Sequence, residues 1–357
     1  MTKEVDVLFK LIRLSLGKER DSSLPNDVNW EEVYDMSLKQ GVGAIACDGI
    51  LASKECCIDE DLRFKWMGQS MVIEQKYLHH KNVLAELAKM FQQQGIQMML
   101  LKGYGLSLNY PVPEHRPSGD IDIYLFGDKS KTDEFVEKEL GINVKTSYEK
   151  HSSFIYKGVT IENHGTFFDI YSHPSNEYVN DYICELIEGR TEEVTIGDSC
   201  FVIPNPTLMA IHLLRHTACD FAANSISLRQ VLDWALLVAN RGAEMDLQVI
   251  NTFVEKSGMS QFFQLINAFC EERFGLDSSL FSLTVDVPID CGRFVKDIYL
   301  GKRVSDFPSP SKKLSYGVRK SMQFWQNRWK YKMVYSDSLL SLYFTIAKNR
   351  LIHYIIT

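Results

Sequence analysis

Residues 100–126 read LLKGYGLSLNYPVPEHRPSGDIDIYLF, and this stretch decides the fold. The apolar run at 98–103 ends at a glycine, which is typical of a short buried strand. From Asp120 through Tyr124, acidic and apolar residues alternate, and this period of two predicts a second strand with one polar and one buried face. The predicted order is therefore a strand, a glycine turn, a helix and a strand that carries two aspartates.

Helical segments are expected on both sides of this stretch. Apolar residues recur at helical intervals from Val5 to about Gln94, most clearly between Trp66 and Phe91. The segments around the two strands predict a helix at 131–141, two strands joined at Lys157-Gly158, a hairpin at 195–204, and helices at 178–187, 208–219, 227–239 and 247–274. The expected fold class is α+β, with a small mixed-sheet core flanked by N- and C-terminal helical regions.

Four segments follow from these patterns. We expect a helical N-terminal region at 1–97, an α/β core at 98–175, a mainly helical region at 176–306 and a basic, aromatic helical tail at 307–357. The stretch FPSPSKK, residues 307–313, marks the last boundary with two prolines and a basic pair. Beyond residue 310, nine Lys or Arg residues stand against a single acid, Asp337.

Composition and charge narrow the class of protein. The 357 residues suffice for about two domains. The 45% hydrophobic and 24% charged residues are typical of globular chains and exclude disordered and fibrous classes. The net charge of −7 argues against attraction of the whole protein to nucleic acid. No apolar run is long enough for a membrane span, and the charged start lacks the apolar core of a signal peptide, so a cytoplasmic protein is expected.

Asp120 and Asp122 are the strongest candidates for a metal site. Residues two apart in a strand project from the same face, roughly 6.6 Å apart along the backbone. Neighbouring carboxylates repel each other unless a cation lies between them, and Mg²⁺ with oxygen ligands is the usual cation where phosphates also bind. The pattern therefore predicts Mg²⁺, with Mn²⁺ as an alternative. Two aspartates in this spacing also occur on exposed strands without any ligand.

The segment that contains Lys102-Gly103, Tyr110-Pro111, Arg116 and GDID at 119–122 closely resembles an uncharacterised bacterial nucleotidyltransferase family of the polymerase-beta-type superfamily. The resemblance implies that Asp120 and Asp122 bind metal and that the glycine turn at Gly103 holds a triphosphate. This sequence departs from the superfamily at Tyr104, where serine or glycine is common. Lys102 and Arg116 can supply positive charge to the phosphates instead, or they are solvated surface bases.

The resemblance also implies a third acid on a neighbouring strand, which would assist the attacking hydroxyl. In VTIENH, residues 159–164, Glu162 shares one strand face with Thr160 and His164, so it is the leading candidate for both catalysis and metal binding. Asp169 is the alternative. Both acids can also be ordinary surface residues.

Two further pairs stand four residues apart on predicted helices. His212 and His216 lie on one helical face, and a third zinc ligand is not evident. They are either part of a polar face turned toward the nucleotide or structural histidines. Arg229 and Asp233 have the same spacing and are expected to form a surface ion pair.

Aromatic residues are interspersed among the bases of the tail: Tyr316, Phe324, Trp325, Trp329, Tyr331 and Tyr335. This mixture can stack on nucleic-acid bases or lie on an anionic membrane. The favoured interpretation is an amphipathic helix that packs its aromatic face on the body while its bases stay solvated.

These observations lead to one main functional hypothesis. The chain is expected to transfer a nucleoside monophosphate, most simply AMP, from a nucleoside triphosphate to a hydroxyl of a small molecule or protein, with release of pyrophosphate. Two alternatives stay open: a nucleotide-binding or partner-binding scaffold that has lost efficient turnover, and an RNA-directed transferase that uses the tail as a clamp. A nucleic-acid partner is the less favoured option because the chain as a whole is acidic.

Overall fold

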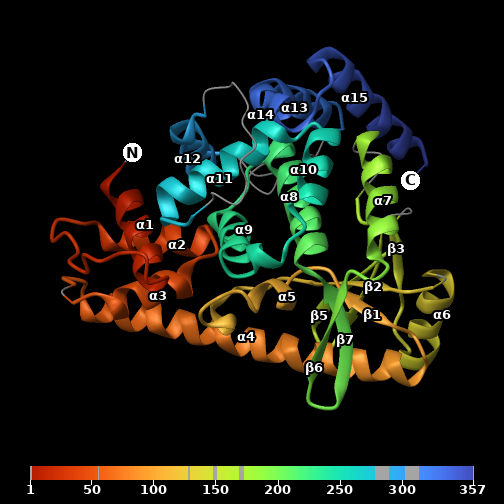
Figure 1. Cartoon of the computed structure of the whole chain (residues 1–357), viewed down its shortest axis with the longest axis horizontal. Coiled ribbons are helices and arrows are strands. Elements are labelled where there is room, and N and C mark those ends of the chain that lie inside the picture. The colour runs from red at the N-terminus through yellow and green to blue at the C-terminus, as the bar shows by residue number, and fades with distance from the viewer. Residues whose placement is uncertain are drawn as a thin grey trace.

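The computed structural model describes residues 2–54, 56–127, 129–147, 151–168, 173–277, 289–301 and 313–356. One mixed sheet lies between a single long helix on one side and a group of helices on the other (Figure 1). The long helix is α4 (Glu60–Gln93), and α8 (Pro206–Ala223) and α9 (Leu228–Arg241) stand on the opposite side. The expected α+β fold class is confirmed.

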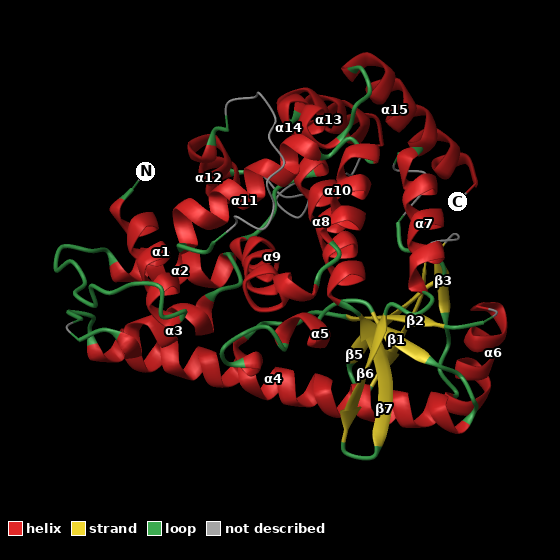
Figure 2. Ribbon diagram, viewed as in Figure 1, coloured by secondary structure: helices red, strands yellow, loops and turns green. Residues whose placement is uncertain are grey.

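The sheet has seven strands in the order β3-β4-β5-β2-β1-β7-β6 (Figure 2). The strands are β1 (Met98–Leu100), β2 (Ile121–Leu125), β3 (Lys145–Ser147), β4 (His151–Tyr156), β5 (Val159–His164), β6 (Thr191–Ile196) and β7 (Ser199–Pro204). β2 runs parallel to β5 and antiparallel to β1, and β1 runs parallel to β7. The predicted hairpin at 195–204 therefore joins the sheet through β7, although it follows the core strands by about 30 residues in the chain.

The predicted N-terminal helices are confirmed as α1 (Lys3–Ser15), α2 (Trp30–Lys39), α3 (Gly43–Ala52) and α4. Helix α4 begins at Asp59, whose carboxylate accepts hydrogen bonds from the first free backbone N–H groups, and it ends before Gly95 at a φ of 69°. Its buried face covers β1 and β7. The first core strand thus follows directly from the helix that supports it.

The C-terminal half is helical, as expected, with one difference. The helices are α7 (Ser175–Ile187), α8, α9, α10 (Leu247–Lys256), α11 (Ser260–Phe274) and α12 (Cys291–Leu300), and the shorter elements of the core are α5 (Tyr104–Ser107), η1 (Pro113–His115) and α6 (Lys129–Leu140). The single helix expected at 247–274 is wrong, because α10 and α11 are separated at Gly258. That glycine has a φ of 73°, which a right-handed helix cannot contain.

The tail forms α13 (Lys313–Gln326), α14 (Arg328–Val334) and α15 (Leu339–Ile356). Its aromatic face packs on the body as predicted, because Phe324, Tyr331 and Tyr335 are buried. The expectation that its bases stay solvated is wrong for Lys330, which is 1% exposed and lies 2.7 Å from the carboxylate of Asp297. Among the described residues, no helix is long and apolar enough to cross a membrane.

A close approach between α1 and α3 generates the first prediction. A Cβ atom on Gly49 would lie 2.1 Å from the backbone oxygen of Leu11, so Gly49→Ala must push the two helices apart. We expect a loss of about 1–3 kcal/mol in the free energy of unfolding. Gly68→Ala is the matched control, because it adds the same methyl to an open position of α4 and should stabilise by roughly 0.5–1 kcal/mol. Urea denaturation measures the free energy of unfolding of both variants. If Gly49→Ala and Gly68→Ala change it equally, the close packing of α1 on α3 is contradicted.

Candidate active site

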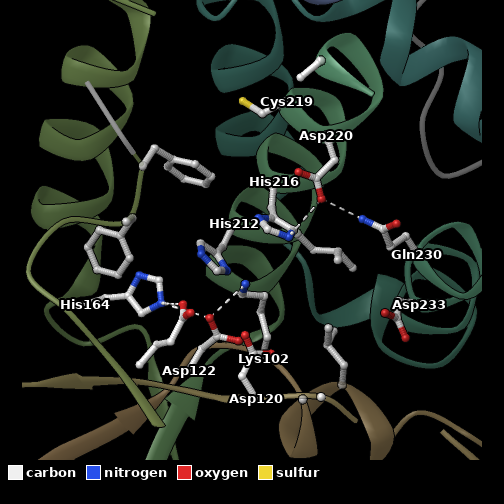
Figure 3. Close-up of a pocket in the computed structure, with 18 of the residues that line it drawn as sticks. Lys102, Asp120, Asp122, His164, His212, His216, Cys219, Asp220, Gln230 and Asp233 are labelled. Carbon is white, nitrogen blue, oxygen red and sulfur yellow. Dashed lines mark hydrogen bonds and ion pairs between the residues drawn. The ribbon is translucent and has the colours of Figure 1, made fainter. Parts of the chain in front are cut away.

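A cavity of about 560 Å³ lies between the sheet and the helices α8, α9, α14 and α15. Its sheet end is lined by Lys102, Asp120, Asp122, Glu162 and His164. Figure 3 shows the side chains of Lys102, Asp120, Asp122 and His164 below those of His212 and His216, with Asp220 farther along α8. The cavity therefore brings together residues from the predicted core, from the C-terminal helices and from the tail.

The carboxylate of Asp122 is the electrostatic centre of this end. Asp122 is 5% exposed, and its Oδ1 accepts hydrogen bonds from Lys102 Nζ at 3.0 Å and His164 Nε2 at 2.9 Å. Burial alone would raise the pKa of Asp122, but the Lys102 ammonium and the His164 hydrogen bond outweigh it and hold the pKa far below its usual range. Asp122 is consequently ionised at any physiological pH.

Parallel pairing between β2 and β5 places Glu162 beside Asp122. The two residues are direct partners in the register, so their side chains project from the same face of the sheet. His164 lies two residues farther along that face, with Nε2 3.7 Å from Glu162 Oε2. Asp122, Glu162 and His164 each offer a ligand atom within 4.8 Å of the other two, which is close enough to hold one metal ion.

Asp120, the first of the two aspartates in the strand pattern, stands apart from this group. Asp120 directly precedes β2, is exposed and lines the same cavity, but it does not belong to the cluster of three ligand atoms. Asp169 lies outside the described residues. His164 was not selected from the sequence as a site residue, although its position on the polar face of the strand, two residues after Glu162, was a signal for it.

The glycine turn has a backbone conformation that favours glycine. Gly103 adopts a φ of 69° and ψ of −108° at the start of α5, which is unfavourable for a residue with a Cβ atom, and it lines the cavity. The Tyr104 ring stacks on Tyr77 of α4 at 5.7 Å and meets the edge of Phe201 at 6.3 Å. It lines a separate small cavity of about 20 Å³, so its hydroxyl does not replace that of a serine in the main one.

Arg116 is neither a solvated base nor a free cation. It is 3% exposed and donates from Nε and Nη2 to the two carboxylate oxygens of Asp233, at 2.7 and 2.9 Å. Tyr110 donates a third hydrogen bond to the same carboxylate at 2.7 Å. Burial opposes both charges, but the pairing raises the pKa of Arg116 and lowers that of Asp233. The predicted surface pair of Arg229 and Asp233 is also wrong in its location, because Asp233 is 2% exposed.

His212 and His216 both line the cavity, from consecutive turns of α8. His212 is buried against Phe168, with ring centroids 5.4 Å apart. Burial, reinforced by the nearby Lys102 ammonium, lowers the pKa of His212 well below its usual value, so this imidazole is uncharged at neutral pH. His216 is partly exposed and lies 3.3 Å from the carboxylate of Asp220.

The loop that carries Arg116 is held by a histidine between two acids. His115 Nδ1 lies 2.6 Å from Asp48 of α3, and Nε2 lies 2.9 Å from Glu74 of α4. The hydrogen bond to Asp48 outweighs the opposing effect of burial, and with Glu74 it raises the pKa of His115. The imidazolium can donate to both carboxylates at once, whereas neutral imidazole has only one N–H.

His115 should therefore make stability depend on pH. Because its pKa is raised on folding, its contribution is fully present below the unfolded value of about 6.5 and is lost as pH rises through the folded value. We expect His115→Asn to lower the free energy of unfolding by about 1–2 kcal/mol near pH 5.5 and by less near pH 9. Urea titrations of wild type and variant at both pH values test this. Equal losses would show that ring packing, and not charge, is responsible.

Comparisons with known proteins identify the family of this chain. A solved structure of an antigenic nucleotidyltransferase-like protein from Paracoccidioides brasiliensis is similar over 57% of this chain and 96% of that chain, with 15% identity and a TM-score of 0.34. No curated protein matches the sequence. The family described as "Uncharacterised nucleotidyltransferase" matches residues 26–275, which include the sheet, α8, α9 and every cavity residue outside the tail. The chain belongs to this uncharacterised nucleotidyltransferase family.

Proposed function

We propose that this nucleotidyltransferase moves a nucleoside monophosphate from a nucleoside triphosphate to a hydroxyl of a small molecule or protein. The observation that carries this proposal is the alignment of Asp122 with Glu162 on paired parallel strands, in a cavity that also contains Asp120, Lys102 and Gly103. Aligned carboxylates and a glycine turn are the parts that transfer of a phosphoryl group needs for metal and triphosphate. The acceptor oxygen forms a bond to the α-phosphorus, the bond to the β-phosphate breaks, and pyrophosphate leaves.

A divalent metal ion fits the residues at this end of the cavity. Asp122 and Glu162 offer the oxygen ligands that Mg²⁺ prefers, and Asp120 lines the same space. His164 adds a nitrogen ligand, which Mg²⁺ uses less readily than transition metals do, so Mn²⁺ is a fitting alternative. When bound, such an ion supplies a positive charge that orients the phosphates and stabilises the developing negative charge.

The remaining steps belong to the chain itself. Lys102, whose ammonium lies 3.0 Å from Asp122, brings a positive charge to the place where we expect the phosphate oxygens. Gly103 lets the backbone approach them closely, since it presents no side chain. Glu162 is partly exposed to the cavity, and besides offering an oxygen to the metal its carboxylate can accept the proton of the attacking hydroxyl.

The tail bears on which acceptors can reach the site. Tyr331 and Tyr335 of the tail line the cavity, and Phe324 packs 4.6 Å from Tyr331. Because these rings are buried, they are not available as a stacking surface for nucleic-acid bases. A small molecule, or one projecting side chain of a protein, suits a cavity of about 560 Å³ better than RNA does.

Binding of nucleoside triphosphates tests the proposal. Calorimetry with each of the four ribonucleoside triphosphates and Mg²⁺ should show metal-dependent binding of at least one, with ATP the first choice. Asp120→Asn/Asp122→Asn should weaken it by at least about tenfold, because the metal loses charged ligands. As a control, Asp198→Asn removes one negative charge from the exposed β6–β7 turn and should have no effect.

Two other outcomes of binding experiments would favour the alternative functions. A folded wild-type chain that binds none of the four triphosphates would contradict enzymatic transfer and favour the scaffold alternative. Steeply salt-dependent RNA binding that disappears on truncation after Pro310 would instead favour the RNA-directed alternative.

The nitrogen ligand predicts a particular metal preference. His164→Asn should weaken Mn²⁺ binding by roughly tenfold and Mg²⁺ binding by clearly less, because imidazole contributes more to the transition metal. Electron paramagnetic resonance of free Mn²⁺ measures the first affinity, and displacement of Mn²⁺ by Mg²⁺ measures the second. Equal weakening of both metals would mean that His164 positions Asp122 and does not bind the ion itself.

A further inference from the structure

Arg229, a second arginine that lines the cavity, has N–H donors that its ion pair does not use. Arg229, in the first turn of α9, lines the cavity together with Lys102 and the acids of the sheet. Its ion-pair partner is Asp233, and the distance from Nη1 to Oδ2 is 3.5 Å, at the limit of a hydrogen bond. A guanidinium carries five N–H donors in a planar fork. Most of the hydrogen-bonding capacity of Arg229 is therefore available to a ligand in the cavity.

The charges around Asp233 leave a local surplus. Arg116 already binds both oxygens of this carboxylate in the bidentate geometry, and Tyr110 adds a neutral donor. One negative charge thus faces two guanidinium groups, so the group carries a net positive charge. Burial and the neighbouring Arg116 lower the pKa of Arg229, and they outweigh the opposing effects of Asp233 and Asp120. A bound anion would supply the missing charge.

The N-terminal helical region holds Arg229 in place. Gln40 accepts hydrogen bonds from the backbone N–H groups of Leu228 and Arg229, at 3.0 and 3.1 Å, and its own amide donates to Ile298 at 3.0 Å. Gly41 adopts a φ of 69°, and a Cβ atom there would come within 3.3 Å of the Arg229 Cβ. The connection between α2 and α3 therefore packs against the aliphatic part of the Arg229 side chain. An arginine that is positioned before binding loses less conformational entropy when it contacts an anion.

We propose that Arg229 binds the β- and γ-phosphates of the nucleoside triphosphate, the part that leaves as pyrophosphate. This inference rests on the proposed function, which places the α-phosphate at the carboxylates of the sheet. Arg229 reaches the cavity from α9, a different wall from the carboxylates, so it meets the phosphates beyond the reacting one. Its fork matches two phosphate oxygens, and it can neutralise charge that develops on the leaving group. Arg116, which the sequence favoured for this role, instead fixes Asp233 beneath it.

Calorimetry with Mg²⁺ and three probes, ATP, AMP and pyrophosphate, tests this assignment. Arg229→Gln should weaken the binding of ATP and pyrophosphate by at least about tenfold, the loss expected for hydrogen bonds to a charged group. The affinity for AMP should change less than twofold. Arg229→Lys keeps the positive charge but loses the planar guanidinium, so its affinity for ATP and pyrophosphate should lie between those of wild type and Arg229→Gln. Arg241→Gln is the matched control, because Arg241 ends the same helix and pairs with Glu192 and Glu244 away from the cavity.

Each other result overturns the assignment in a recognisable way. If wild type binds ATP and Arg229→Gln binds it equally well, Arg229 does not contact the phosphates, and the proposed function stands. If the variant weakens ATP and AMP alike, Arg229 acts on the nucleoside or on the fold. Thermal unfolding of Arg229→Gln distinguishes an effect on the nucleoside from an effect on the fold. If Arg229→Gln is destabilised, binding by Arg229→Lys decides the question. A wild-type chain that binds none of the probes contradicts the proposed function and this inference with it.

Discussion

The buried carboxylate of Asp233 joins the two halves of the site. Asp233 belongs to α9, and its carboxylate accepts hydrogen bonds from Nε and Nη2 of Arg116 and from the hydroxyl of Tyr110. Both donor residues lie in the connection between β1 and β2. Removing one member of such a buried pair typically costs about 3–5 kcal/mol, because the other charge remains without a partner. This one interaction holds the glycine turn and the aspartates of the sheet against the helices that close the cavity.

Charges of opposite sign dominate the two parts of the site. At the sheet, Asp122 and Glu162 lie side by side, and the repulsion between them is offset by Lys102 at 3.0 Å and by His164. On α9 the balance is reversed, with two arginines around one aspartate. In the proposed function, a triphosphate with its metal would bring positive charge to the first group and negative charge to the second. The cavity therefore has an electrostatic polarity that matches the ligand class implied by the family.

Segments far from the core in sequence complete the cavity. Gln40 and Gly41 support the first turn of α9, while Tyr331 and Tyr335 line the cavity from the tail. The tail is anchored partly through Lys330, whose ammonium lies 2.7 Å from Asp297 of α12. Because the family match ends at residue 275, the cavity residues of α14 and α15 lie outside it. Differences in this part of the wall can change which acceptor enters without changing the carboxylates of the sheet.

Local pattern alone was sufficient to predict the strands at 98–103 and 120–124, the glycine turn and the helices around them, because these depend on periodicity and backbone preference within a few residues. It also placed Glu162 on the correct face of its strand. The pattern could not reveal that Glu162 and Asp122 are register partners, that Arg116 is buried on Asp233, or that His164 joins the acids. Those facts depend on which strands pair and which helices pack above them. Such long-range contacts have no local signature, so the sequence pattern could not show that both arginines line the cavity or that Arg116 is the one bound to both oxygens of Asp233.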